Sequence, residues 1–523
     1  MSAPVDLNEA RKRRGKGAAA SSKSGAAKAD DPLSLRVKAL NETHAFVLLG
    51  SDGWVLHEGV DWQQRPCVNF LSINGFRQWL DTERYLDGET QKTAGLGSLW
   101  LKHPLRRTFQ GVAMAPEGVP EGWYNLWRGF AVTPAEPYDD LKHHVRHFRS
   151  LYDHVLRNVA KGNPDHARWI WAWFAQMVQD PVAKPGTAMV FRGEKGSGKS
   201  KMGEAIGSLW GIHHVVIDQP KHLVGSFNGH MANCVLLQAE EGFWAGDQTA
   251  DGRLKSLITS QVQLIERKGV DATPMRNLVH LMVTSNSDWV VPATFDERRF
   301  AVFDVGNGNK QDHVFFKALD AELDAGGREH LLAYLLSFDL SAVDVRVIPH
   351  TTGLYEQKIA TMSELQAWWI DRLREGKLIP QHGDWKREVG TDALFRCFRA
   401  YAELLRSKSR LLTKEQFGMA LRKLMPDGFR ANQKIWVDAY GDAGEELRNA
   451  DGSRTRKRVN GYHIPSLREC REKFDQLVGA KVDWGDDVEA IPADSHAQAD
   501  AYVAENAHSE GQRDSRGDFI LTD

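Results

Sequence analysis

One segment, GEKGSGKS at residues 193–200, constrains this 523-residue chain more than any other. It follows a short apolar run, TAMVFRG (187–193), and precedes a stretch of helical composition, Lys201–Trp210. It fits the pattern G-x-x-x-x-G-K-[ST], in which backbone N–H groups of a glycine-rich turn surround phosphates at the start of a helix. Because the flanking strand and helix are the context that this motif needs, the sequence predicts a P-loop rather than a chance glycine-rich turn.

Each part of this segment has a chemical role in the prediction. Lys199 is expected to reach the β- and γ-phosphates of ATP, and the Ser200 hydroxyl is expected to bind Mg²⁺. The residues predicted to bind the nucleotide are Gly193, Glu194, Lys195, Gly196, Ser197, Gly198, Lys199 and Ser200.

Two acidic residues follow a later apolar strand pattern, CVLLQA at 234–239, and are Glu240 and Glu241. A P-loop protein needs an acidic metal partner at the end of a neighbouring strand. One carboxylate is expected to help hold Mg²⁺, and the other to polarise the attacking water. We assign Glu240 to the metal and Glu241 to the base. The reverse order and a plain surface pair are the alternatives.

Two further motifs follow in chain order. An apolar strand pattern at 278–283 leads to Asn286, whose amide is expected to orient the attacking water. The segment DERRF (296–300) precedes another strand pattern and contains Arg298 and Arg299. A guanidinium there is expected to stabilise transition-state charge as an arginine finger. The choice between the two arginines stays open, and ion pairing of both with the acidic residues beside them is the alternative.

The pattern of short apolar runs alternating with helical stretches over 187–305 predicts an α/β fold with buried, parallel strands. Taken together, the four motifs resemble those of superfamily 3 helicases, which include the parvovirus Rep proteins and the helicase parts of phage and plasmid primase-helicases. The resemblance is closest to the phage and plasmid group and extends over about residues 90–475.

The resemblance implies an AAA+-like ATPase core and an ATP- and Mg²⁺-dependent DNA helicase that acts in phage or plasmid replication. It also implies a homo-oligomer, a hexamer in our interpretation, in which the arginine finger acts on a neighbour's ATP. The expected location is the cytoplasm of a bacterial host, with a separate primase or replication initiator as a further candidate partner. The first 180 residues show no Asp-x-Asp strand followed by a histidine, so DNA priming is not expected.

In that family, the stretch between the acidic pair and the next strand forms a pore hairpin that grips single-stranded DNA. The matching stretch here is Gln261–Leu278, with Arg267, Lys268 and Gly269 at its expected tip. A basic turn that contains glycine also suits a loop that follows a phosphate backbone. Arg267 and Lys268 are therefore predicted to contact DNA, and a plain surface hairpin is the alternative.

Residues 385–476 are predicted to form a winged-helix domain that binds double-stranded DNA. Two helix patterns, the second with a Thr-x-x-Gln capping signature at Thr413, precede two strand patterns at 434–440 and 456–464. Residues 386–473 contain 20 basic and 12 acidic side chains, an excess that suits a DNA backbone. A basic protein-docking domain is the alternative. The residues predicted to contact DNA here are Arg454, Arg456, Lys457 and Arg458.

Composition divides the rest of the chain. We expect a β-hairpin at His44–Gly59. No structural zinc site is expected, because the four cysteines lie far apart. No membrane role is expected, because no apolar run reaches the roughly 20 residues that a span needs. The expected parts are a basic disordered leader (1–32), an α+β domain of unknown role (33–137), a helical collar (138–185), the ATPase domain (186–375), the winged helix (385–476) and an acidic disordered tail (477–523).

Two other functions were weighed against a helicase. The first is a DNA-binding replication initiator or regulator in which the nucleotide only switches assembly. The acidic pair and the arginines favour turnover over binding alone. The second is a small-molecule kinase, for which the sequence shows neither an acceptor site nor a lid motif.

Overall fold

The structure is a computed structural model that describes residues 31–62, 65–87, 90–138, 140–241, 248–380, 384–404, 412–439 and 447–485. Most of the expected leader and tail, residues 1–30 and 486–523, therefore lies outside the described residues. The chain divides into two compact units, Met1–Val112 with Glu121–Tyr124, and Ala113–Pro120 with Asn125–Asp523. No helix within the described ranges is long and apolar enough to cross a membrane.

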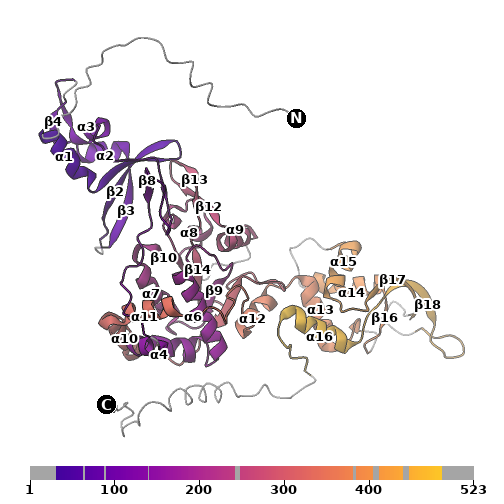
Figure 1. Ribbon diagram of the computed structural model, residues 1–523. Helices are drawn as coiled ribbons and strands as arrows, with labels where there is room; N and C mark the ends of the chain where they lie inside the picture. Colours follow the sequence, from indigo (N-terminus) through magenta and orange to yellow (C-terminus); the bar gives the residue numbers. More distant parts are fainter. Residues whose placement is uncertain are drawn as a thin grey trace, which may run out of the picture. The chain divides into compact units, whose positions relative to one another are not determined.

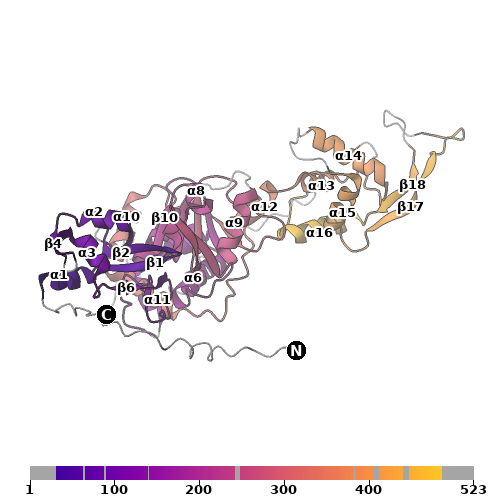
Figure 2. The ribbon, with the colours of Figure 1, turned by 90° about the horizontal axis from the view of Figure 1, so that it is seen from above.

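The first unit is built on a four-stranded sheet in the order β3-β2-β1-β6, whose strands β2 and β3 are labelled in Figure 1 and β1 and β6 in Figure 2. The hairpin expected at His44–Gly59 is present, since β1 and β2 pair antiparallel. An unexpected helix, α1, begins at Pro32, and the Asp31 carboxylate caps it. The elements are α1 (Pro32–Asn41), β1 (His44–Leu49), β2 (Asp52–Val60), β3 (Pro66–Ser72), α2 (Ile73–Trp79), β4 (Arg84–Leu86), β5 (Thr93–Gly95), α3 (Leu96–Lys102) and β6 (Thr108–Phe109). Two short strands, β7 (Gly111–Ala113) and β8 (Trp123–Asn125), follow and pair with each other.

The second unit contains a five-stranded parallel sheet in the order β10-β11-β14-β9-β15. Two of its three interior strands, β9 and β14, are buried along their whole length, as strands covered on both faces should be. The α/β fold with parallel strands that the sequence predicts is thereby confirmed. The strands are β9 (Ala188–Arg192), β10 (His214–Ile217), β11 (Leu236–Glu240), β14 (His280–Ser285) and β15 (Phe300–Asp304).

Helices from two parts of the chain surround this sheet (Figures 1 and 2). Helix α7 (Lys199–Trp210) packs against β10, β11 and β14, and α11 (Arg328–Ser337) packs against both α7 and α6 (Pro164–Gln179). Helix α6 carries the aromatic run WIWAWF at 169–174, which is buried throughout. The other helical segments are α4 (Leu141–Val145), η1 (Arg146–Phe148), α5 (Arg149–Asp153), the π-helix η2 (His154–Val159), η3 (Gly211–His213), α8 (Pro220–Val224), η4 (Gly229–Met231), α9 (Gln248–Thr259), α10 (His313–Glu322) and η5 (Leu323–Gly327).

The expected hairpin between the acidic pair and the next sheet strand is also present. Strands β12 (Val262–Arg267) and β13 (Val270–Arg276) pair antiparallel and are joined by Lys268 and Gly269. Gly269 has a φ of 77°, a left-handed conformation that glycine adopts without strain.

The C-terminal part of the second unit is a helical cluster beside a three-stranded sheet in the order β16-β18-β17. The expected capping signature is confirmed, because Thr413 and Gln416 form a capping box at the start of α15. The elements are α12 (Thr352–Ala360), α13 (Glu364–Glu375), β16 (Glu388–Gly390), α14 (Thr391–Leu404), α15 (Lys414–Leu424), β17 (Arg430–Asp438), β18 (Arg456–His463) and α16 (Leu467–Val478).

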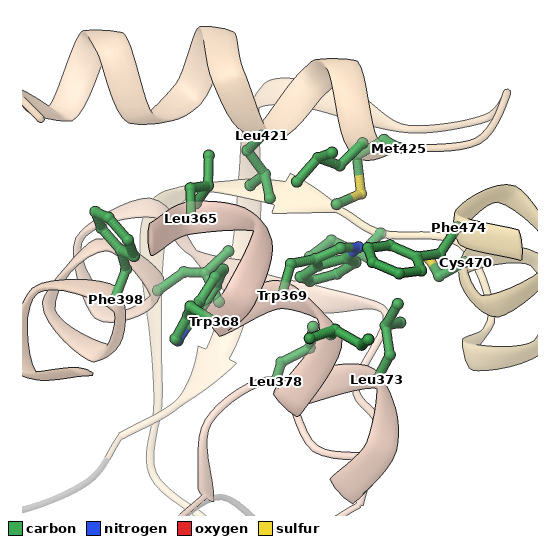
Figure 3. Packing of buried hydrophobic residues seen from close by; sticks show 14 of the residues in the cluster. Leu365, Trp368, Trp369, Leu373, Leu378, Phe398, Leu421, Met425, Cys470 and Phe474 are labelled. Carbon is green, nitrogen blue, oxygen red and sulfur yellow. The ribbon is translucent and has the colours of Figure 1, made fainter. Parts of the chain in front are cut away.

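One hydrophobic core holds these C-terminal elements together (Figure 3). Trp368 and Trp369 of α13 are fully buried at its centre. Trp368 contacts the rings of Phe398 and Phe417, from α14 and α15, at centroid distances of 5.7 and 5.8 Å. Helix α13 therefore belongs to the same core as α14 and α15.

We predict that Trp368→Ala destabilises this core by about 3–5 kcal/mol, because it removes a large buried side chain and leaves a cavity. Hydrogen exchange of the α14 and α16 amides would report the local free energy of opening. Trp436→Ala is the matched control. Trp436 is 52% exposed, so its loss should change the opening free energy by less than about 0.5 kcal/mol. Equal effects of the two variants would contradict the packing described here.

Candidate active site

A cavity of about 470 Å³ lies where β9, β11 and β14 end. Parallel strands direct their carboxyl ends to one edge of a sheet, and ligands of α/β proteins bind there. Three segments that are far apart in the sequence meet at this edge for that reason. Of the nucleotide-binding and catalytic residues predicted from the sequence, those that line the cavity are Lys195, Gly196, Gly198, Lys199, Ser200, Glu240, Glu241 and Asn286.

The glycine-rich loop between β9 and α7 depends on two left-handed residues. Gly196 and Gly198 have φ angles of 80° and 87°, which L side chains rarely adopt. A Cβ atom at Gly198 would also lie 2.6 Å from the ring of His154 and 2.7 Å from that of Phe316. Only glycine fits at this position, which directly precedes α7 and lines the cavity with Lys199 and Ser200, whose N–H groups have no partner within the helix.

Lys199 is almost fully buried, and its ammonium group is surrounded by oxygen atoms. The Nζ atom donates to the carbonyls of Gly193 and Glu194, at 2.8 and 2.7 Å, and to Asn286 Oδ1 at 2.9 Å. Burial lowers the pKa of Lys199, and the nearby Glu241 and Glu194 carboxylates oppose that shift. A cation held this way next to a helix N-terminus offers what a phosphate group needs.

The two predicted acids face different partners. Asn286 Nδ2 donates to Glu241 Oε1 at 3.0 Å, so a continuous polar chain runs from Lys199 through Asn286 to Glu241. Glu240 Oε1 instead accepts from the buried Gln238, 2.8 Å away. Glu241 has a φ of 67°, an uncommon conformation for a non-glycine residue and one that concentrates at functional sites.

The side-chain oxygens of Ser200 and Glu240 at this edge could hold Mg²⁺ together with the phosphates of a nucleotide. Among the described residues, no three His, Cys, Asp or Glu side chains could hold a metal ion by themselves. Mg²⁺ is commonly bound by one or two protein oxygens plus substrate phosphates. Ser200 and Glu240, which both line the cavity, fit that pattern.

Sequence reasoning missed two residues that support the loop from behind. Asn158, in η2, donates from Nδ2 to the Ser197 carbonyl at 2.9 Å, and its Oδ1 accepts from Gly308 N at 3.0 Å. His154, one π-helical turn earlier, lies 3.3 Å through Nε2 from the Gly198 carbonyl. Both side chains are buried. The two residues lie four apart in the segment HVLRNV, and that spacing was the one available signal.

The ionisation of His154 fixes its role. Burial lowers the pKa of His154 to about 4, so the ring is neutral at pH 7. Asn309 Nδ2 donates to its Nδ1 at 3.0 Å, which leaves the proton on Nε2 to donate to the Gly198 carbonyl. His154 and Asn158 thus connect the glycine-rich loop to the segment after β15.

The two candidate finger arginines lie outside this cavity. Arg298 is exposed and Arg299 is partly buried. The buried Glu297 carboxylate accepts from their backbone N–H groups at 3.0 and 2.6 Å. Among the described residues, no acidic side chain forms an ion pair with either guanidinium.

The predicted DNA contacts differ in accessibility. Lys268 is exposed at the turn between β12 and β13, whereas Arg267 is partly buried and burial lowers its pKa. In the C-terminal part, Lys457 and Arg458 are exposed on β18. Arg454 and Arg456 are also exposed but lie 3.3 and 3.9 Å from the Asp438 carboxylate.

Comparisons with known proteins agree with this architecture. Residues 191–299, which run from the last two residues of β9 to the residue before β15, match DUF5906, described as a family of unknown function. No curated protein matches the chain. The apo structure of the NrS-1 C-terminal region is similar, with a TM-score of 0.57 and 15% identity over 84% of this chain and all of that one. Its A form is similar too, with a TM-score of 0.55, 16% identity and coverage of 83% and 100%. These similarities establish a shared fold.

We predict that Asn158→Ala weakens nucleotide binding about tenfold, because the Ser197 carbonyl loses its buried donor and the loop loses a fixed orientation. Asn158→Asp tests the geometry further, since it keeps the acceptor for Gly308 N but removes the donor. Equilibrium binding of a fluorescent ATP analogue, with a thermal unfolding curve for each variant, measures both effects. A variant that unfolds earlier but binds the analogue normally would show that Asn158 is only structural.

Proposed function

We propose that this chain is an ATP-dependent DNA helicase or translocase of the superfamily 3 type, acting in phage or plasmid DNA replication. The observation that carries the proposal is the polar chain Lys199–Asn286–Glu241 at the carboxyl edge of the parallel sheet. It unites a cation for phosphates, an amide and a carboxylate base in one cavity. On this proposal the parallel sheet is an AAA+-like P-loop core, and the C-terminal part is a winged helix.

In this proposal the glycine-rich loop and Lys199 hold the phosphates of ATP, while Ser200 and Glu240 hold its Mg²⁺. Bound Mg²⁺–ATP supplies a phosphoanhydride bond whose hydrolysis releases free energy. The N–H groups that begin α7 and the Lys199 ammonium bind the negative charge. Lys199 would exchange its carbonyl partners for phosphate oxygens, and the Asn286 amide would continue to orient Glu241.

Glu241 acts as the general base in this scheme. Its carboxylate accepts a proton from a water molecule, and the Asn286 N–H group holds Oε1 in place meanwhile. Asn286 contacts both Lys199 and Glu241. A shift of the Lys199 ammonium, the cation proposed to bind phosphate, would therefore reach the Glu241 carboxylate through Asn286. This link favours hydrolysis over a nucleotide that only switches assembly.

The arginines support a shared site in a homo-oligomer, which we take to be a hexamer. Arg298 is exposed and lies outside its own chain's cavity, so a guanidinium there is available to a neighbour's nucleotide. An arginine supplied in trans stabilises charge that develops on the transferred phosphoryl group.

DNA contacts are assigned to the β12–β13 hairpin and to the C-terminal part. Lys268 is exposed at the hairpin turn, while the Asn228 side chain donates to the Leu264 carbonyl and accepts from Glu266 N, at 2.8 and 2.7 Å. These bonds fix the β12 backbone and leave the tip accessible. Lys457 and Arg458 supply phosphate contacts for duplex DNA.

We predict that single-stranded DNA stimulates ATP hydrolysis by this chain. Lys199→Ala should abolish turnover, because the cation for the β- and γ-phosphates is lost. Lys268→Ala should keep basal hydrolysis but lose the stimulation and strand displacement. The control is Lys317→Ala, which removes an exposed lysine of α10 and should change none of these rates. Hydrolysis that is unaffected by DNA, without strand displacement, would favour the nucleotide-switched initiator instead.

A second prediction concerns the arginines. A chain with both Arg298→Ala and Arg299→Ala should be inactive alone, as should the Lys199→Ala chain. Mixing the two should restore part of the ATPase activity, because some intact loops would then face intact arginines. Co-assembly is checked by pull-down of differently tagged chains. Mixed assemblies without any activity would contradict a shared site.

A further inference from the structure

The β17–β18 ribbon presents an exposed tryptophan on its outer side. Ile435 and Val459 pair across the two strands, and Ile435 is buried, so their neighbours point to the opposite face. Trp436 pairs there with Arg458, and it is 52% exposed. We define the ribbon face as the outward residues Lys434, Trp436, Arg458 and Asn460, all of which are exposed.

The two charged side chains of the ribbon face, Lys434 and Arg458, are basic and exposed. Lys434 stands two residues before Trp436 on the same side of β17, and Arg458 lies directly across from the indole. Asp438, two residues after Trp436 and on the same side of β17, is already paired with basic side chains. Its carboxylate accepts from Lys386 at 3.0 Å, which lowers the pKa of Asp438, and Arg454 and Arg456 also lie within 4.0 Å. A polyanion therefore meets an aromatic surface flanked by cations.

Burial in the protein does not explain the exposed indole. The hydrophobic core of this part of the chain is formed by other residues, and Trp436 is not among them. A duplex backbone does not need an aromatic surface either, because phosphates are bound by charges and hydrogen bonds. The bases of an unpaired strand do present flat faces that stack on aromatic side chains.

We propose that the ribbon face binds single-stranded DNA, with Trp436 stacking on an unpaired base and Lys434 and Arg458 contacting the flanking phosphates. This inference deepens the proposed function, because it rests on the assignment of DNA binding to the C-terminal part. It adds a site for unpaired bases that is separate in sequence from the β12–β13 hairpin and that shares Arg458 with the proposed duplex contacts. The chain would then hold a strand at the ribbon face as well as at the hairpin.

The test is binding of the full-length chain to a fluorescent oligothymidylate and to a blunt duplex, followed by anisotropy without nucleotide. All variants carry Lys268→Ala, so that the hairpin does not mask the effect. Trp436→Ala should weaken oligothymidylate binding about tenfold and leave duplex binding within about twofold. Trp436→Phe should keep most of the affinity, since a phenyl ring still stacks. Trp62→Ala, which removes a tryptophan that is 86% exposed in the first unit, should have no effect.

Each of four other outcomes of this experiment would overturn the proposed stacking of Trp436 on an unpaired base. Unchanged oligothymidylate binding by Trp436→Ala, with normal wild-type affinity for both DNAs, overturns this inference and leaves the proposed function standing. Equal losses on both DNAs would show a general backbone contact and overturn stacking. Loss of self-association with unchanged DNA binding would assign Trp436 to a contact between copies. A wild-type chain that binds neither DNA would overturn both proposals.

Discussion

The parallel alignment of five strands is the constraint on which the rest of the second unit depends. Because β9, β11 and β14 run the same way, their carboxyl ends meet, and Asn286 comes within hydrogen-bonding distance of both Lys199 and Glu241. An antiparallel neighbour would carry its last residue to the opposite edge. The chemistry of the cavity is therefore a result of topology as much as of residue type.

A second layer of buried polar contacts keeps that edge in one arrangement. Asn158 and His154 hold the carbonyls of Ser197 and Gly198, and both also contact the segment at 308–309. Buried polar groups that are fully paired specify a single conformation, whereas a broken pair is costly. The π-helical geometry of η2 places both side chains on the loop, in keeping with the frequent occurrence of such turns near functional sites.

The local motifs were predictable from the sequence, while contacts between distant segments were not. The glycine-rich loop, the strands of the sheet and the capping box at Thr413 each depend on a few adjacent residues. The role of Asn158 depends on Ser197 and Gly308, which no short pattern links to it. Helix α1 was missed because its signal, Asp31 before Pro32, follows directly on a long basic leader.

The ion pairs of the Asp438 carboxylate affect how steeply DNA binding by this part of the chain would depend on salt concentration. A protein that neutralises phosphates releases condensed counterions, and the number released sets the steepness of its dependence on salt. Arg454 and Arg456 lie within ion-pair distance of Asp438, as does Lys386. Their positive charge is therefore compensated more than that of Lys457 and Arg458 before any phosphate binds. The counterions released here would then be fewer than a count of basic residues implies.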